Sequence, residues 1–153
     1  TQNYIRLLAD YLKKQPGFIR FLDDETIDLL SKSAPLHDIG KVGVSDRILL
    51  KPGKLTEQEF EEMKQHTVYG RDTILVAERK LGNTSFLHIA REIAYTHHER
   101  WDGSGYPEGL RGDAIPLGAK ILAVADAFDA MCSDRPYRQG MSEDKIDAIL
   151  RAG

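Results

Sequence analysis

Apolar residues recur every three or four positions along almost the whole of this 153-residue chain, and runs that alternate apolar with polar residues are lacking. This periodicity is typical of amphipathic helices, whereas a half-buried strand alternates with a period of two. The first helical stripe consists of Tyr4, Ile5, Leu8 and Leu12. We therefore expect an all-α fold, a compact bundle of about six or seven helices in one domain covering residues 1–153.

Glycine, proline and capping residues mark the ends of the expected helices. Pro16 and Gly17 end the first helix, and Thr56 with Glu59 three residues later has the spacing of a capping box. Residues 99–116 are rich in glycine and contain two prolines, which predicts a loop. The expected helices cover 2–14, a segment opening at 24, a segment opening after Thr56, 68–81, 86–98, 117–133 and a segment after Ser142.

The overall charge does not indicate a polyanionic partner. The formal net charge is −3, with 41% hydrophobic and 29% charged residues, which is ordinary for a folded globular protein. A chain without a global basic field does not collect nucleic-acid polymers non-specifically. A ligand that carries phosphate would therefore have to be held locally, by metal ions or by a few arginine and lysine side chains.

Cysteine content and hydropathy indicate the compartment. Cys132 is the only cysteine, so an intramolecular disulfide is excluded, and we interpret this residue as a small buried hydrophobe. No run approaches the roughly 18 apolar residues of a membrane span, and the first residues carry no signal-peptide pattern. We expect a cytoplasmic domain without a membrane segment.

Four of the five histidines stand at positions that suggest a shared site. The pair His37-Asp38 follows an apolar helix, and the pair His97-His98 ends another helix immediately before the long loop. His66 has the spacing of the core-facing side of its helix. His88 belongs to no such group, and we interpret it as an ordinary helix residue.

Asp126 is an acidic residue in the most apolar of the expected helices. Its neighbours are Ile121, Leu122, Val124, Ala125 and Phe128, so we expect its side chain to be buried. An ionised carboxylate in such a place costs several kcal/mol unless a cation compensates it. No lysine or arginine lies within one turn on the same helix, so a metal ion is the simplest compensation.

Each of these residues alone also has an ordinary structural explanation. A lone inward histidine is usually hydrogen-bonded within the core, a His-Asp pair often caps a helix, and Asp126 could cap a neighbouring helix. Four histidines and two aspartates in one small domain, without competing sulfur ligands, together favour a divalent first-row metal that activates water.

Longer motifs identify a family. The chain contains HDIGK at 37–41, LKPGKL at 50–55, HHERWDGSGYP at 97–107, ADAFDA at 125–130 and SDRPYR at 133–138. In this order the motifs resemble the HD-GYP family, a branch of the HD metal-dependent phosphohydrolase superfamily, and the resemblance extends from Tyr4 to Leu150. Several long motifs in the right order are far more specific than one short pattern.

The resemblance implies a centre with two divalent metal ions. The first ion would be bound by His37, Asp38 and Asp126, the second by His66, His97 and His98, and Asp38 would bridge the two. Iron or manganese would be the working metal, and zinc, nickel and magnesium would also bind nitrogen and oxygen donors of this kind.

The resemblance also implies contacts to the substrate. Lys41 would direct its ammonium at the phosphate, where negative charge develops. Arg135 and Arg138 would hold a second phosphate, although such a pair is also typical of solvated surface. Asp129, one turn from Asp126, would orient a ligand or contact the substrate.

The loop that contains Gly105, Tyr106 and Pro107 would brace the segment after the histidine pair, because glycine permits tight turns and proline stiffens them. In relatives this loop is associated with contacts to diguanylate cyclase domains. We expect Trp101 to pack inside the loop, while Tyr106 either packs there or forms an interaction surface.

Two segments of the family pattern lie outside this sequence. Members normally carry a glutamate and a histidine just before the position of Thr1, the histidine as a further metal ligand and the glutamate for a third metal. They also continue past Gly153 with a motif that closes the substrate pocket. We therefore expect a fragment of a longer protein, in which a receiver or sensory domain precedes this one and sets its activity.

The implied activity is hydrolysis of a phosphodiester bond in cyclic di-GMP, a bacterial second messenger, to linear pGpG and in some relatives to GMP. One alternative is an HD hydrolase that acts on another nucleotide, such as a different cyclic dinucleotide or a nucleoside polyphosphate. The other is a metal-binding module that signals through protein contacts without turnover. A lost ligand or a missing Lys41 would mark that module, and this sequence shows neither.

Overall fold

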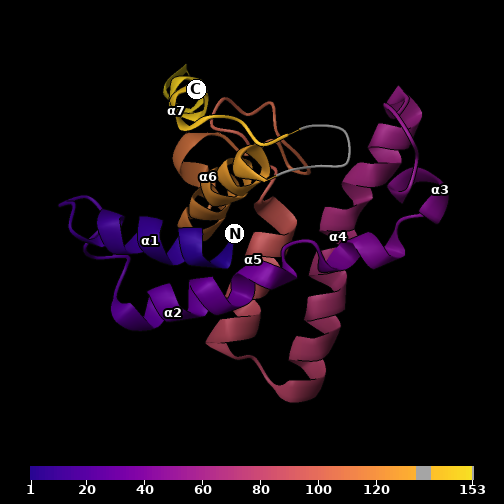
Figure 1. Cartoon of the computed structure of the whole chain (residues 1–153). Coiled ribbons are helices and arrows are strands. Elements are labelled where there is room, and N and C mark those ends of the chain that lie inside the picture. The colour runs from indigo at the N-terminus through magenta and orange to yellow at the C-terminus, as the bar shows by residue number, and fades with distance from the viewer. Residues whose placement is uncertain (134–138, 153) are drawn as a thin grey trace.

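The computed structural model describes residues 1–133 and 139–152, and within these ranges the chain forms helices and no strand (Figure 1). The α-helices are α1 (Gln2–Lys13), α2 (Asp24–Ser33), α3 (Asp46–Leu49), α4 (Glu57–Leu81), α5 (Ser85–Thr96), α6 (Leu117–Cys132) and α7 (Glu143–Ala152). The 3-10 helices are η1 (Ala34–Leu36), η2 (Ile39–Gly43) and η3 (Gly112–Ala114). The prediction of an all-α fold is confirmed.

Side-chain caps begin three of the helices. Asp23 accepts a hydrogen bond from the backbone of Thr26 at the start of α2, and Thr84 caps α5 in the same way. Thr56 and Glu59 form the predicted capping box at the start of α4. Each such cap satisfies a backbone N–H group that has no partner within its helix and contributes about 1 kcal/mol.

The prediction of separate helices after Thr56 and over 68–81 is wrong, because α4 is one helix of 25 residues. Gly70 lies within it, but no turn interrupts the helix there. A Cβ atom at Gly70 would lie 3.3 Å from the Cβ atom of Ala94, so the glycine permits α5 to pack closely against α4. The short elements α3, η1, η2 and η3 were not predicted, because they are too short to show a period.

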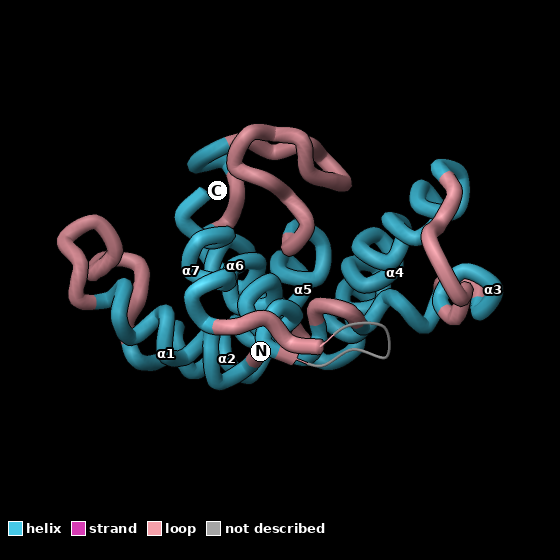
Figure 2. The backbone as a smooth tube through the Cα atoms, turned by 45° about the horizontal axis from the view of Figure 1, so that its top comes forward, coloured by secondary structure: helices cyan, strands magenta, loops and turns pink. Residues whose placement is uncertain are grey.

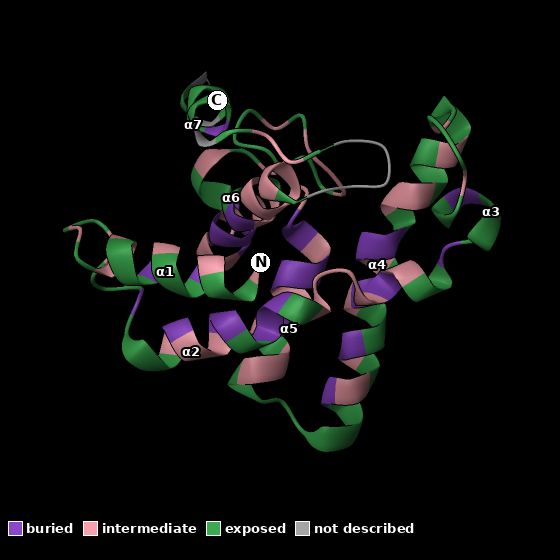
Figure 3. Ribbon diagram, in the orientation of Figure 1, coloured by how far each residue is buried: buried purple, intermediate pink, exposed green. Residues whose placement is uncertain are grey.

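The hydrophobic core surrounds α5, which packs against α2, α4 and α6. Figure 3 shows the buried segments of these helices and of α1 facing one another. The core consists of Ile5, Ala9, Leu22, Ile27, Leu30, Ala34, Ile93, Ile121, Leu122 and Ala125. Each large aliphatic side chain buried there contributes about 1.5–3 kcal/mol, which positions α5 and α6. A second, smaller cluster of Ile74, Ala90 and Ala94 joins α4 to α5.

Two connections bring chemically active residues toward α5. The chain passes from α2 to α3 through η1 and η2, and η2 packs against α4. The longest described loop runs from α5 to α6 and forms an arch at one end of the molecule (Figure 2). None of the described helices is long and apolar enough to cross a membrane.

Candidate metal centre

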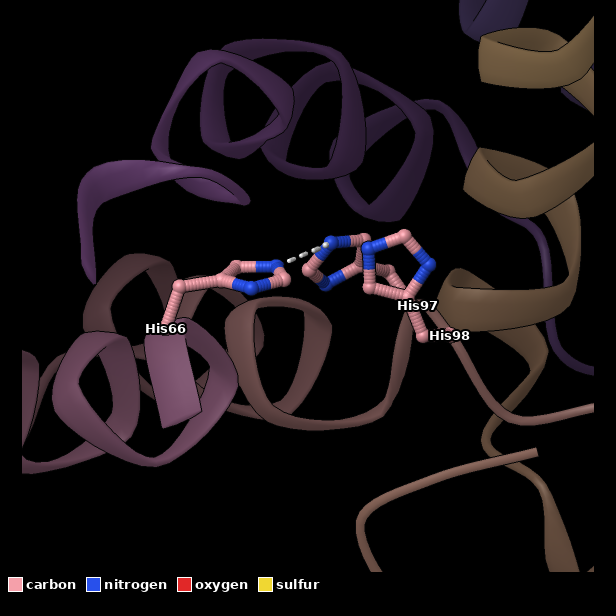
Figure 4. A group of neighbouring side chains, drawn as sticks. All are labelled: His66, His97 and His98. Carbon is pink, nitrogen blue, oxygen red and sulfur yellow. Dashed lines mark hydrogen bonds between the residues drawn. The ribbon is translucent and has the colours of Figure 1, made fainter. Parts of the chain in front are cut away.

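Three histidines, one on α4 and two at the C-terminal end of α5, converge on one point. His66 projects from the middle of α4, His97 is the C-cap residue of α5, and His98 follows it (Figure 4). One ring nitrogen from each lies within 4.8 Å of those from the other two. His66 and His97 are buried and His98 is half-buried. Imidazole nitrogens gathered in this way could hold a divalent metal ion.

Backbone carbonyl groups orient three of the imidazole rings. The hydrogen bonds run from Nδ1 of His37 to the oxygen of Ala34 (2.6 Å), from Nδ1 of His66 to that of Met63 (2.7 Å) and from Nδ1 of His97 to that of Ile93 (3.1 Å). A carbonyl oxygen only accepts, so each Nδ1 carries a proton, and the neutral rings of His66 and His97 present the lone pair of Nε2. A second hydrogen bond of this kind is what holds a histidine as a metal ligand.

The Nε2 atoms of His66 and His97 face each other at 3.4 Å. Because both nitrogens present lone pairs, this approach is unfavourable unless a cation compensates it. The donor set therefore fits a metal ion on its own chemistry.

The pKa values of the three clustered histidines favour their metal-binding form. Burial lowers the pKa of His66. Burial, together with neighbouring histidines, lowers the pKa of His97 to about 3 and that of His98 to about 4. All three rings are therefore neutral at neutral pH, and a metal ion does not have to displace a proton from them.

Asp38 divides its two oxygens between two groups of residues. Its Oδ1 lies 3.6 Å from Nε2 of His66 and 3.8 Å from Nε2 of His97. Its Oδ2 lies 3.3 Å from Nε2 of His37, and Oδ1 of Asp126 lies 3.8 Å from that same nitrogen. A carboxylate with one oxygen toward each group has the arrangement of a ligand shared by two cations.

The charge on Asp38 is stabilised by its neighbours. Burial would raise the pKa of this carboxyl, but hydrogen bonds from His37 and Lys41 outweigh burial and hold the pKa well below its ordinary value. Nζ of Lys41 donates to Oδ2 at 2.6 Å. Burial would likewise lower the pKa of His37, but Asp38 and the carbonyl of Ala34 together raise it more.

Asp126 lies beside His37, as predicted, but it is not buried. Its side chain is 43% exposed, because α6 turns Ile121, Leu122 and Ala125 into the core and leaves Asp126 at the edge of that face. One side of the carboxylate is therefore solvated. The prediction that Asp126 is buried is therefore wrong, and the desolvation cost of its charge does not by itself require a metal ion.

The other predicted substrate contacts are placed less fully. Oδ2 of Asp129 accepts hydrogen bonds from the amino group of Thr1 at 2.7 Å and from its hydroxyl at 2.6 Å. Arg135 and Arg138 lie outside the described residues.

His88 is exposed on α5 next to Arg91, as expected of an ordinary helix residue. Cys132 is a free cysteine of intermediate burial rather than a buried one.

The loop after His98 folds back onto the candidate ligands. A Cβ atom at Gly105 would lie 2.3 Å from the nitrogen of Arg100 and 2.5 Å from the oxygen of His98, so only glycine permits this close approach. The Tyr106-Pro107 peptide bond is cis. The ring of Tyr106 stacks on His98, with centroids 4.7 Å apart and an interplanar angle of 26°. Of the two alternatives left open for Tyr106, the structure therefore shows packing, against a candidate ligand.

A buried carboxylate holds this loop in place. Glu99 accepts hydrogen bonds from the backbone N–H groups of Glu108 (2.8 Å) and Leu110 (2.9 Å). Glu99 has no role predicted from sequence, because nothing in its spacing distinguishes it from a solvated acid. The expectation that Trp101 packs inside the loop is wrong, since Trp101 is 65% exposed. The Glu99 carboxylate, rather than the indole, anchors the loop.

Comparison with known proteins identifies a family and several relatives of this chain. Residues 18–152 match the model of the HD domain family. The chain is 53% identical over 153 residues to a cyclic di-GMP phosphodiesterase of Vibrio cholerae serotype O1, which covers 100% of this chain and 31% of the relative. It is 47% identical over 131 residues to a cyclic di-GMP phosphodiesterase response regulator of Xanthomonas campestris pv. campestris, which covers 86% of this chain and 33% of the relative.

A third relative acts on a different cyclic dinucleotide. The chain is 44% identical over 152 residues to 3'3'-cGAMP-specific phosphodiesterase 2 of Vibrio cholerae serotype O1, which covers 99% of this chain and 28% of the relative. The chain thus spans about a third of the length of these curated relatives.

Proposed function

This chain belongs to the HD domain family, and on that premise we propose that it is a metal-dependent phosphodiesterase that hydrolyses cyclic di-GMP to linear pGpG, with GMP as a further product. The observation that carries the proposal is the position of Asp38, with one oxygen toward His66 and His97 and the other toward His37. The HD-GYP motifs and the relatives named cyclic di-GMP phosphodiesterases support the choice of substrate.

Two groups of residues would hold two divalent ions. The first group is His37, Asp38 and Asp126, and the second is His66, His97 and His98, with Asp38 shared. Nitrogen and oxygen donors without sulfur favour iron or manganese, while zinc, nickel and magnesium are also compatible. When bound, such ions supply Lewis-acid activation of the phosphodiester and of the attacking water.

Lys41 would stabilise the charge that develops on the phosphate. Its side chain is partly exposed, and its ammonium already lies 2.6 Å from Oδ2 of Asp38 at the candidate centre. A cation fixed next to the reacting phosphate acts more strongly in the transition state than in the ground state. Asp129 would orient a ligand, and Arg135 with Arg138 would hold the second phosphate of the substrate.

A second substrate is favoured by the relative that is specific for 3'3'-cGAMP. Cyclic di-GMP and 3'3'-cGAMP share the same phosphodiester ring and differ in one base, so a metal centre that acts on the phosphate does not distinguish between them. Discrimination must come from residues that contact the bases.

Regulation and location belong to the same proposal. One relative is named a response regulator, which supports a longer protein in which a receiver or sensory domain controls this domain. The loop of Gly105, Tyr106 and Pro107 would contact a diguanylate cyclase domain, and the reaction would take place in the cytoplasm. Residues 1–153 would form one domain of that protein.

The test is hydrolysis of cyclic di-GMP by the chain loaded anaerobically with ferrous or manganous ion, with 3'3'-cGAMP measured in parallel. Asp38→Ala removes the shared carboxylate and should abolish turnover. His88→Ala, which removes an exposed histidine outside the centre, should leave it unchanged. A metal-loaded wild type that hydrolyses neither dinucleotide would contradict the enzymatic proposal for this chain and favour the binding module.

A further inference from the structure

Two aromatic rings and one ammonium group lie together beside the candidate metal centre. The rings of Phe60 and Tyr106 have centroids 6.2 Å apart at 84°, an edge-to-face contact. Nζ of Lys64 lies 5.1 Å from the centroid of Phe60 and 5.5 Å from that of Tyr106. One residue from the α5–α6 loop and two from α4, one helical turn apart, therefore form a single wall.

This wall begins at the candidate ligands. Tyr106 stacks on His98 and also meets the ring of His66 edge-on, with centroids 6.5 Å apart. Phe60 contacts Tyr106 and is the next ring beyond it. In a nucleotide the base is separated from the phosphate by one sugar, so a base would meet this wall when its phosphate lies at the centre.

Packing of the core does not explain Phe60. Its side chain is 44% exposed, and it belongs to neither of the hydrophobic clusters found among the described residues. It lies on the first turns of α4, which extend away from the bundle toward α3 (Figure 1). An exposed aromatic ring fixed by a second ring offers a flat surface on which a base can stack.

The chemistry of the wall suits a purine that carries hydrogen-bond acceptors. Aromatic side chains stack on any base, which makes Phe60 and Tyr106 tolerant of base identity. Lysine donates to O6 and N7 of guanine, whereas adenine presents an amino donor in place of O6. The ion pair of Lys64 with Glu61, at 2.6 Å, does not prevent this donation, since Glu61 is largely exposed and such pairs contribute little.

We infer that Phe60 and Tyr106 form a stacking subsite for one base of the substrate and that Lys64 gives this subsite a preference for guanine over adenine. The inference rests on the proposed function, because it assigns a base to the nucleotide whose phosphate the metal centre holds. It also supplies the discrimination between cyclic di-GMP and 3'3'-cGAMP that the centre alone lacks.

The test measures binding to the whole manganese-loaded chain by calorimetry, with GMP, AMP and ribose 5-phosphate as probes. GMP and ribose 5-phosphate share sugar and phosphate and differ in the base. The wild type should bind GMP roughly tenfold or more tightly than ribose 5-phosphate. Phe60→Ala should reduce this ratio toward one and leave the affinity for ribose 5-phosphate unchanged, while Phe60→Trp should retain the ratio.

Lys64→Met should keep tight binding of GMP relative to ribose 5-phosphate but lose the preference for GMP over AMP. Phe21→Ala is the matched control, because Phe21 is also an exposed phenylalanine and lies between α1 and α2, away from the candidate centre. If the ratio of the affinity for GMP to that for ribose 5-phosphate is as high in Phe60→Ala as in Phe21→Ala, the subsite is overturned. An equal loss of GMP and ribose 5-phosphate would also overturn it, since that result means Phe60 only supports the loop.

Failure of the subsite is separable from failure of the proposed function. If the wild type hydrolyses cyclic di-GMP but binds GMP no more tightly than ribose 5-phosphate, the subsite is overturned and the proposed phosphodiesterase function stands. A GMP ratio that depends on Phe60, in a chain without turnover, would support the subsite and contradict the phosphodiesterase.

Discussion

Gly40 and His66 approach so closely that a Cβ atom on Gly40 would lie 1.9 Å from the carbonyl oxygen of His66. The same atom would lie 2.4 Å from the nitrogen of Gly70, so two turns of α4 block it with backbone that has little freedom to move. The contact seats η2 against α4. It thereby fixes how far Asp38, which precedes η2, lies from His66.

Gly40→Ala should therefore damage the candidate centre as well as the fold. We expect η2 to shift away from α4, with a loss of about 1–3 kcal/mol in the free energy of unfolding and weaker manganese binding. Urea unfolding and calorimetric titration with manganese measure the two effects. Gly17→Ala is the control, because a Cβ atom at Gly17 meets no described atom within 4 Å. Unchanged metal affinity in Gly40→Ala would show that this contact does not position Asp38.

Lys41→Met should separate metal binding from catalysis. Lys41 contacts the centre only through its bond to Asp38 among the described residues, so the histidines should keep their positions and the metal content should stay the same. Loss of a cation that stabilises the transition state lowers kcat by about 10²–10³-fold. Lys13→Met, which removes a lysine paired with Asp24 on the surface, should change neither quantity. If Lys41→Met instead loses metal in proportion to activity, Lys41 supports the ligands rather than the reaction.

Helical periodicity was sufficient to predict the fold class and the inward position of His66. A residue on the core side of a helix repeats with a known spacing, and the sequence pairs at 37–38 and 97–98 lie where helical segments end. The direction in which each ring points could not be predicted. It depends on the backbone carbonyls that accept from Nδ1, and these are placed by the packing of η1, α4 and α5.

The residues that were missed or misjudged from sequence act through contacts that leave no periodic pattern in the sequence. The partners of Glu99 are backbone N–H groups nine and eleven residues further along a loop. The exposure of Asp126 depends on how α1 and α5 cross α6, and the contact of Phe60 with Tyr106 depends on the path of the loop. Local patterns carry no information about such distances.

The metal-free chain should lose stability as the pH falls below neutrality. The pKa values of His97 and His98 are about 3 and about 4 in the folded chain, below the ordinary value of 6.5. Between these values the unfolded chain binds more protons than the folded one, so protons favour unfolding. His37 acts in the opposite direction, since its pKa is raised and its contribution is lost as the pH rises.

The strongly lowered pKa values of His97 and His98 oppose the one raised pKa of His37. We therefore expect the free energy of unfolding to fall by a few kcal/mol between about pH 7 and pH 5. Thermal melting of the chelator-treated chain at several pH values measures it. His97→Gln should flatten the dependence by removing one of the two groups. A melting temperature that rises on acidification would contradict the assignment of neutral, buried histidines.

Glu99→Ala should release the loop that carries Tyr106. The change leaves the N–H groups of Glu108 and Leu110 without their acceptor, at a cost of about 2–4 kcal/mol, and Glu99→Gln should cost less because one acceptor oxygen remains. Hydrogen exchange at these two amides should become faster, and urea unfolding gives the free energy. Asp113→Ala, which truncates an exposed acid at the end of the same loop, is the control. Equal effects of Glu99→Ala and Asp113→Ala would exclude a special role for the buried carboxylate.

His66→Leu should stabilise the metal-free chain while it abolishes stabilisation by metal. His66 is buried with its Nε2 atom 3.4 Å from that of His97, and both nitrogens present lone pairs, so the metal-free centre contains an unfavourable contact. Leucine has a similar volume, removes that contact and adds apolar burial on the inner face of α4.

Manganese should raise the melting temperature of the wild type, since it binds the folded state alone, and should leave that of His66→Leu almost unchanged. His88→Leu, on the exposed face of α5, should keep the full response to manganese. A metal-free His66→Leu chain that is less stable than the wild type would mean that the Nδ1 bond to Met63 contributes more than the facing lone pairs cost, and that the histidine cluster is favourable without metal.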